Sequence, residues 1–131
     1  GQDSQEVTIT VIGQGQIPVP IPIISEEHKL RTTSLYAEND EVKAGDYLNV
    51  YTRIKNYGSF SEDGVKVRVT IPELGIIEQL TATHLEEDDQ RLKIFMVYIP
   101  KDTKPGYYVL KSQVFNGNSE ETEAIEFRVI L

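Results

Sequence analysis

The sequence predicts an all-β protein, a β-sandwich, on three observations. Apolar and polar residues alternate with a period of two along most of the chain, as where Leu48, Val50, Thr52 and Ile54 share one face. Clusters of turn-forming residues separate these runs at intervals of about 10 to 15 residues, which is typical of two packed antiparallel sheets. No segment keeps a helical period, so almost no helix is expected.

The alternating runs predict seven strands after residue 28. The clearest is the second, because Gly45-Asp46 precedes it and Asn56-Tyr57-Gly58 ends it with residues that tolerate positive φ. Pro72 ends the third strand, since proline cannot donate to a ladder, and Asn116-Gly117 predicts a hairpin before the last strand. The predicted strands cover residues 30–38, 46–56, 64–71, 76–84, 90–99, 106–115 and 121–131.

Composition narrows the function classes. The 131 residues suit one domain with one core. The net charge of −8 leaves no basic face for nucleic acid or for an anionic membrane surface, so neither partner is expected. No apolar run is long enough to insert in a bilayer. Cysteine is absent, which excludes disulfides, thiolate metal sites and a cysteine nucleophile.

The sequence carries no catalytic motif, and we expect neither an enzyme nor a cofactor. The two histidines, His28 and His84, each follow or precede carboxylates, but no serine or cysteine motif accompanies them. Acidic clusters at residues 38–41, 62–63 and 86–89 have two interpretations. They form a solvated acidic surface, which is the commoner case, or loops at one end of the sandwich converge on Ca²⁺.

Exposed tyrosines offer a further alternative. Tyr47 and Tyr51 fall on the polar face of the second strand, and Tyr57 follows it. Such rings stack on sugars in carbohydrate-binding surfaces, although cross-strand tyrosine packing is the more frequent explanation.

The first 28 residues are predicted to form an extended β arm, separate from the sandwich at residues 29–131. The arm has four acidic residues and no Lys or Arg, so half of the net charge lies in about a fifth of the chain. Residues 6–12 alternate as a strand. In residues 17–24, Pro18, Pro20 and Pro22 remove the N–H groups along one edge, so this piece can pair on one side only.

The arm is long enough to reach a neighbouring molecule. Residues 6–24 would span roughly 60 Å when extended, whereas a domain of about 100 residues is roughly 35 Å across. Residues 94–99 are apolar on both faces, which indicates either cover by a loop or packing of another chain segment. The candidate subunit-interface residues are Val7, Ile9, Val11, Ile17, Val19, Ile21 and Ile23 on the arm and Phe95, Val97 and Ile99 on the sandwich.

The turn-strand-turn pattern from Val42-Lys-Ala-Gly-Asp46 to Asn56-Tyr57-Gly58 resembles the CARDB-type Ig-like modules of bacterial and archaeal surface proteins. Residues 65–76 and 99–117 are similar to modules of archaeal S-layer proteins. The resemblance covers about residues 29–131 and implies a seven-stranded Ig-like sandwich with an extracellular structural or adhesive role. It also implies a tyrosine corner at Tyr107 or Tyr108, the alternative being ordinary cross-strand packing.

These observations predict a structural subunit of a cell-surface assembly, an S-layer or an extracellular filament. The arm would be a strand donated to the next subunit, making a homo-oligomer. The alternative is an Ig-like adhesion or carbohydrate-binding module of a larger surface protein. In that case the arm is a linker or folds back on its own sheet.

Overall fold

The computed structural model describes residues 27–131, apart from the side chains of residues 81 and 82. Eight strands and one short 3-10 turn, η1 (Pro72–Leu74), make up this part of the chain. The strands are β2 (Leu30–Ala37), β3 (Glu41–Lys43), β4 (Tyr47–Asn56), β5 (Glu62–Ile71), β6 (Ile76–Leu85), β7 (Gln90–Tyr98), β8 (Gly106–Phe115) and β9 (Glu120–Ile130).

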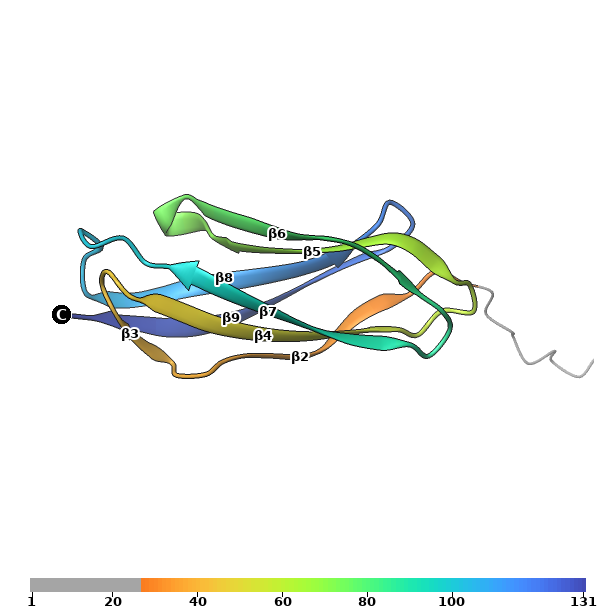
Figure 1. Cartoon of the computed structure of the whole chain (residues 1–131), viewed down its shortest axis with the longest axis horizontal. Helices are drawn as coiled ribbons and strands as arrows, with labels where there is room; N and C mark the ends of the chain where they lie inside the picture. The colour runs from red at the N-terminus through yellow and green to blue at the C-terminus, as the bar shows by residue number, and fades with distance from the viewer. Residues whose placement is uncertain (1–26) are drawn as a thin grey trace, which may run out of the picture.

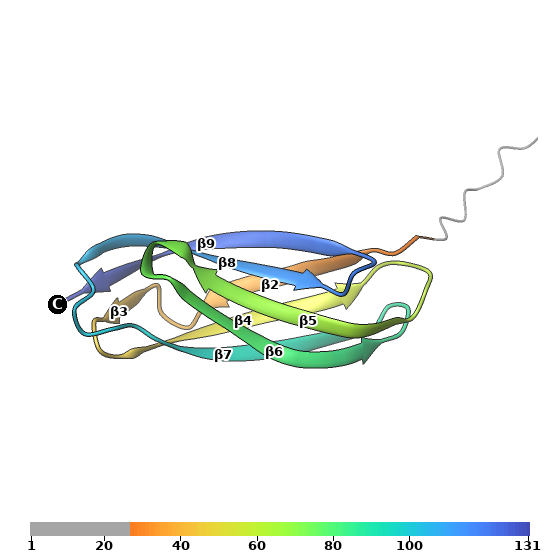
Figure 2. The ribbon, with the colours of Figure 1, turned by 90° about the horizontal axis from the view of Figure 1, so that it is seen from above.

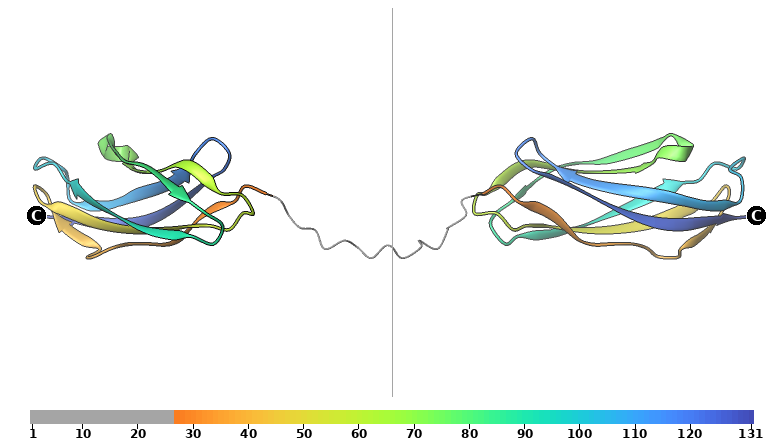
Figure 3. Two further views of the ribbon diagram at one scale, coloured as in Figure 1. Left: turned by 45° about the vertical axis from the view of Figure 1, so that its right-hand side comes forward. Right: turned by 180° about the vertical axis from the view of Figure 1, so that it is seen from behind.

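The strands form a two-layer sandwich (Figure 1). A three-stranded sheet has the order β2-β4-β7, and a five-stranded sheet has the order β3-β9-β8-β5-β6. The layers are elongated, with the start of β2 at one end and the C-terminus at the other (Figure 2). β2 lies against β9 and closes one long side between the sheets (Figure 3).

The prediction of an all-β sandwich is confirmed, and the seven predicted strands match β2 and β4 to β9 within two residues at each end. The sequence analysis missed β3, which has three residues and pairs in parallel with β9. Val42, at the centre of β3, lies in the core opposite Val129. Such a short strand has no visible periodicity, so only its partner reveals it.

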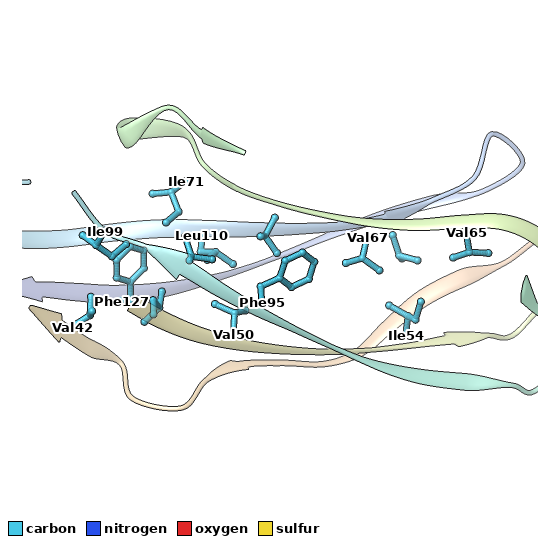
Figure 4. Packing of buried hydrophobic residues seen from close by; sticks show 14 of the residues in the cluster. Val42, Val50, Ile54, Val65, Val67, Ile71, Phe95, Ile99, Leu110 and Phe127 are labelled. Carbon is cyan, nitrogen blue, oxygen red and sulfur yellow. The ribbon is translucent and has the colours of Figure 1, made fainter. Parts of the chain in front are cut away.

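The core lies between the sheets and follows the predicted alternation (Figure 4). Ile54 of β4 lies opposite Val65 and Val67 of β5, and Leu48 and Val50 of β4 belong to the same buried cluster. Thr52 shares this buried face, and its Oγ1 accepts a hydrogen bond from Ser112 Oγ at 3.4 Å. The polar pair is therefore buried together, which avoids leaving a lone hydroxyl in the core.

Three residues predicted for a subunit interface belong instead to this core. Phe95, Val97 and Ile99 are at most 3% exposed, so they are not surface residues of the folded domain. β7 is apolar on both faces, and the sequence alone did not reveal which face points inward. The register decides it, because Phe95 lies opposite the buried Val50.

The tyrosine corner is at Tyr108. Its hydroxyl donates a 2.6 Å hydrogen bond to the carbonyl of Lys104, and its ring stacks on Phe127 at 5.9 Å. Tyr107, the other candidate, points outward and is 64% exposed. The hydrogen bond ties the loop before β8 to the strand itself.

Candidate functional site

The outer face of the three-stranded sheet is the main exposed apolar surface of the described residues. Because alternate residues of β4 are buried, Tyr47, Asn49, Tyr51 and Arg53 point away from the core. Their partners on β7 follow from the antiparallel register and lie on the same outer face. These partners are Tyr98, Met96, Ile94 and Leu92.

The four β7 residues form a continuous row, which we call the β7 strip: Leu92, Ile94, Met96 and Tyr98. Met96 is 61% exposed and Ile94 is 50% exposed. Single exposed apolar residues are common, but a contiguous row of them marks interaction sites. β7 is also an edge strand, since β4 is its only strand partner among residues 27–131. Both the side chains and one backbone edge of β7 therefore lack cover from this part of the chain.

Three tyrosines border the β7 strip, and they form two cross-strand pairs, one of which includes Tyr98 of the strip itself. Tyr36 of β2 stacks on Tyr51 with ring centroids 5.1 Å apart and planes 11° from parallel. Tyr47 contacts Tyr98 at 5.4 Å with the rings tilted by 58°. These pairs stiffen the sheet and leave aromatic surface exposed to solvent.

Glu38 supplies the polar contacts beside the stacked pair. Its Oε1 accepts a hydrogen bond from Asn49 Nδ2 at 3.2 Å and another from the Tyr51 hydroxyl at 3.4 Å. The negative charge of Glu38, followed by partial burial and this hydrogen bond, raises the pKa of Tyr51. The Tyr51 hydroxyl therefore stays protonated and remains a donor at neutral pH.

The strands of the three-stranded sheet are basic, so the expectation that this acidic chain has no basic face is wrong for this sheet. Its strands contain five Lys or Arg residues and no Asp or Glu, although the chain has a net charge of −8. Three of these residues are paired with carboxylates outside the sheet, at 3.4 Å for Arg31, 4.0 Å for Lys55 and 3.9 Å for Arg91. Within residues 27–131, the side chains of Arg53 and Lys93 have no carboxylate partner. This sheet is therefore able to attract an acidic segment.

The chain enters the sandwich through residues 27–29, which we call the arm root. Its backbone pairs with the loop after β4. The Tyr57 N–H donates to the Lys29 carbonyl at 2.8 Å, and the Ser59 N–H donates to the Glu27 carbonyl at 3.0 Å. Gly58 allows this close approach, because a Cβ there would lie only 2.3 Å from the Glu27 oxygen.

A buried carboxylate fastens the side chain of the arm root. Glu62 at the start of β5 is fully buried, and its Oε2 lies 2.5 Å from Nδ1 of His28. The His28 ring also stacks on Phe60 at 4.6 Å. Asn116 and Asn118 of the β8–β9 turn donate to the other carboxylate oxygen at 2.8 and 3.3 Å. Burial alone would raise the pKa of Glu62, but these hydrogen bonds and the charge of His28 lower it overall.

His84 contacts two carboxylates. Its Nδ1 lies 2.5 Å from Oδ1 of Asp63, which follows Glu62 in β5, and its Nε2 lies 3.6 Å from Oε2 of Glu86. The hydrogen bond to Asp63 raises the pKa of His84, and the opposing effect of burial is outweighed by this bond together with the charge of Asp63 and the contact with Glu86. Both histidines are thus held by neighbouring carboxylates of β5.

No set of three or more His, Asp and Glu side chains within residues 27–131 is placed to bind a metal ion. The acidic cluster at residues 38–41 lies near the C-terminal part of β9, as the hydrogen bond from Arg128 N to the Asp40 carbonyl shows. Residues 62–63 lie at the opposite end, beside Asn116 and the arm root. Within the same part of the chain, no helix is long and apolar enough to cross a membrane.

The structure separates the predicted site residues. Tyr47 and Tyr51 share the outer face, whereas Tyr57 lies beyond the end of β4. The Lys55 ammonium nitrogen lies over the Tyr57 ring, 4.8 Å from the ring centroid. Tyr36 and Leu92 were missed. The sequence analysis noted that residues 94–99 are apolar on both faces, but it named the buried face as the interface and not the exposed one. The alternation of residues 90–98 would identify the strip once the buried face of β7 is known. The arm candidates Val7, Ile9, Val11, Ile17, Val19, Ile21 and Ile23 lie outside the described residues.

Comparison with solved structures finds a CARDB domain from Pyrococcus furiosus, crystallised in complex with di-metal ions. It matches with a TM-score of 0.63 and 19% identity over 80% of this chain and 90% of that chain. The chain has a CARDB-type fold. The solution NMR structure of the same CARDB domain gives a TM-score of 0.60 and 18% identity over 80% of this chain and 97% of that one.

The CARDB-type fold also occurs within proteins of other activities. A DNA-bound alkylpurine DNA glycosylase from Pseudomonas fluorescens matches with a TM-score of 0.56 and 13% identity, over 80% of this chain but only 31% of the glycosylase. No protein-family model and no curated protein sequence matches this chain. At these identities the likeness establishes the Ig-like sandwich alone, and a function has to be argued from the surface.

Proposed function

We propose that this CARDB-like domain is a non-catalytic structural subunit of an extracellular cell-surface assembly, an S-layer or a filament. Subunits join when residues 6–24 of one copy are donated to the sandwich of the next. The observation that carries the proposal is the β7 strip, an exposed apolar row on an edge strand. Exposed edges invite pairing with another chain, and surface strands otherwise carry polar residues on the solvent side.

Burial of the apolar arm residues would contribute favourably to such a contact. If the seven apolar arm residues named above were half-buried on a neighbour, the gross gain would be on the order of 7 kcal/mol. Ordering the arm and losing rigid-body freedom oppose a large share of this gain. Backbone hydrogen bonds to an edge strand add to it, since they satisfy groups that otherwise require water.

The arm root suits a segment that transmits force between subunits. Residues 27–29 are held by backbone hydrogen bonds to the loop after β4 and by the buried pair of His28 with Glu62. The root lies at one end of the elongated sandwich, opposite the C-terminal end (Figure 1). An arm leaving from one end of each body and bound by the next makes a heterologous contact, which propagates into a fibre or a closed ring.

Size-exclusion chromatography and negative-stain microscopy of the full chain and of a variant lacking residues 1–25 test the proposal. We expect the full chain to form concentration-dependent oligomers or filaments and the truncated variant to remain a folded monomer. Circular dichroism controls for the fold of the variant. Elution of both proteins as monomers across the concentration range would disprove the proposal.

The second candidate function is that of an adhesion or carbohydrate-binding module. It is favoured by the stacked Tyr36 and Tyr51 rings beside Glu38 and Asn49, because aromatic faces with adjacent hydrogen-bonding groups suit sugar rings. Binding to a glycan array that is lost in Tyr51→Ala and kept in Tyr57→Ala would support this function. Tyr57 is the matched control because it is exposed but lies beyond the end of β4.

A further inference from the structure

We propose that residues 6–12 of a neighbouring copy add as a strand to the outer edge of β7. This inference rests on the proposed function and names the acceptor within it. Val7, Ile9 and Val11 then continue the outer face beside the β7 strip. Glu6, Thr8 and Thr10 lie on the other face of the added strand, beside the basic residues of β7.

The pattern of β7 matches this segment on both faces. On the outer face, Leu92, Ile94 and Met96 are at least 41% exposed and are spaced two residues apart. Val7, Ile9 and Val11 have the same spacing, so they meet the strip as same-face neighbours in a widened sheet. On the other face, Arg91 and Lys93 lie opposite the buried Ile54 and Thr52 in the register, so they are on the core-facing side of the sheet, where Arg91 is exposed and Lys93 is partly exposed. In the added strand, Glu6, Thr8 and Thr10 would lie beside Arg91 and Lys93.

The charges favour pairing of β7 with the arm of a neighbouring copy over pairing with the β7 strand of that copy. β4 and β7 contain four basic residues and no acidic residue, whereas residues 1–28 contain four acidic residues and no basic one. Symmetric pairing of two β7 edges would place the Arg91 and Lys93 side chains of both copies close together. Like charges on neighbouring strands are destabilising, and a lysine at a sheet edge is a known guard against such pairing. Residues 6–12 contain one acidic residue, Glu6, and no basic residue, so a strand made of them avoids this repulsion.

The other sheet offers a poorer acceptor. Its edge strand β6 has Ile77 exposed on its outer face, but the next outward residue is the polar Gln79. Glu78 follows Ile77 on the other face of the strand, where it would repel an acidic arm. β6 therefore lacks both the apolar row and the basic charge of β7.

The proline-rich part of the arm favours a neighbouring copy over the arm's own sandwich. Pro18, Pro20 and Pro22 fix φ and disfavour helix at the preceding residues, so residues 17–22 suit a semi-rigid extended segment between the root and the added strand, with one edge still free to pair with the neighbour. Six residues in such an extended conformation, at about 3.1 Å each, would span roughly 20 Å. For residues 6–12 to reach β7 of the same chain, the chain would have to reverse direction within residues 13–16.

Engineered cysteines test the contact in the full chain, which has no native cysteine. A protein with Ile9→Cys is mixed with a protein carrying Ile94→Cys, and disulfide formation is followed by non-reducing electrophoresis and peptide mass spectrometry. The matched control replaces Ile94→Cys by Ile77→Cys, at another exposed isoleucine on an edge strand. We expect 9–94 disulfides to predominate clearly over 9–77 disulfides.

The outcomes separate the acceptor from the assembly itself. Filaments or oligomers that give no preference for 9–94 over 9–77 overturn the β7 acceptor while the proposed function stands. Absence of any assembly overturns both. A double variant with Ile9→Cys and Ile94→Cys that closes a disulfide within one monomer also overturns the proposal, because the arm then docks on its own sandwich.

A charge reversal gives an independent readout. Arg91→Glu combined with Lys93→Glu should abolish assembly, and adding Glu6→Lys should restore part of it. Assembly of the double variant at the level of the unmodified chain would contradict the proposal. Raising the salt concentration should weaken assembly of the unmodified chain, because exposed charge pairs are screened.

Discussion

Phe95 and Met96 are adjacent in β7 but face opposite sides of the sheet. Phe95 is 3% exposed and lies in the core, whereas Met96 is 61% exposed on the outer face. Both side chains are large and apolar, so their chemistry does not distinguish them. The register with β4 does, since Phe95 lies opposite the buried Val50 and Met96 lies opposite the partly exposed Asn49. This pairing separates a residue required for folding from one available for contact.

Replacing each of these residues by alanine tests that separation. Phe95→Ala should lower the free energy of unfolding by about 3–5 kcal/mol, because it removes a buried ring and leaves a cavity. Met96→Ala should change it by less than about 0.5 kcal/mol, as is usual for exposed positions. Urea unfolding at a concentration where the protein is monomeric measures both. Similar losses for the two variants would show that the outer face is covered.

Asn116 is expected to be a main support of the buried Glu62. Its Nδ2 donates to Glu62 Oε1 at 2.8 Å and to the Asp63 carbonyl at 3.0 Å. Its Oδ1 also accepts hydrogen bonds from two backbone N–H groups of the β8–β9 turn. Asn116→Ala should therefore cost about 2–3 kcal/mol of unfolding free energy, since it leaves a buried charged group under-satisfied. In the exposed control Asn39→Ala, chemical denaturation should detect almost no change.

The lowered pKa of Glu62 predicts a loss of stability in acid. A carboxyl group with a depressed pKa in the folded state stabilises the fold above its ordinary pKa of 4.5. That contribution is lost as the pH falls through the lower folded-state pKa, because protonation removes the charge that His28 and the asparagines stabilise. Glu62→Gln should therefore show a shallower fall in unfolding free energy over this acidic range. Equal slopes for the two proteins, measured by urea unfolding at several pH values, would rule out Glu62 as the cause.

The tyrosine corner predicts different effects at two adjacent tyrosines. Tyr108→Phe removes the hydroxyl that donates to the Lys104 carbonyl but keeps the ring stacked on Phe127. The unfolding free energy should fall by about 1 kcal/mol, as for loss of one hydrogen bond. Tyr107→Phe should have little effect, because this side chain is exposed. Thermal unfolding of the pair provides the comparison, and a larger loss for Tyr107→Phe would contradict this assignment.

The strands and most of the core were predictable because their signals are local. The alternation in β4 and β5 identifies Val50 and Val67 as buried without reference to any partner strand. The pairings of the histidines were not predictable in this way. His28 lies next to glutamates in the sequence, yet its partner is Glu62, 34 residues away. A hydrogen bond between distant segments depends on how the two sheets close, which no local pattern records.

The sequence by itself determined the all-β class, the positions of seven strands and their turns, and the acidic alternating character of the first 28 residues. Each of these follows from side-chain periodicity and backbone preference within a few residues. Only the tertiary structure decided that β3 pairs with β9, that Phe95 is buried and Met96 exposed, and that β7 is a basic edge with an apolar outer face. Those features depend on which strands become neighbours, and strand neighbours are selected by packing across the whole domain.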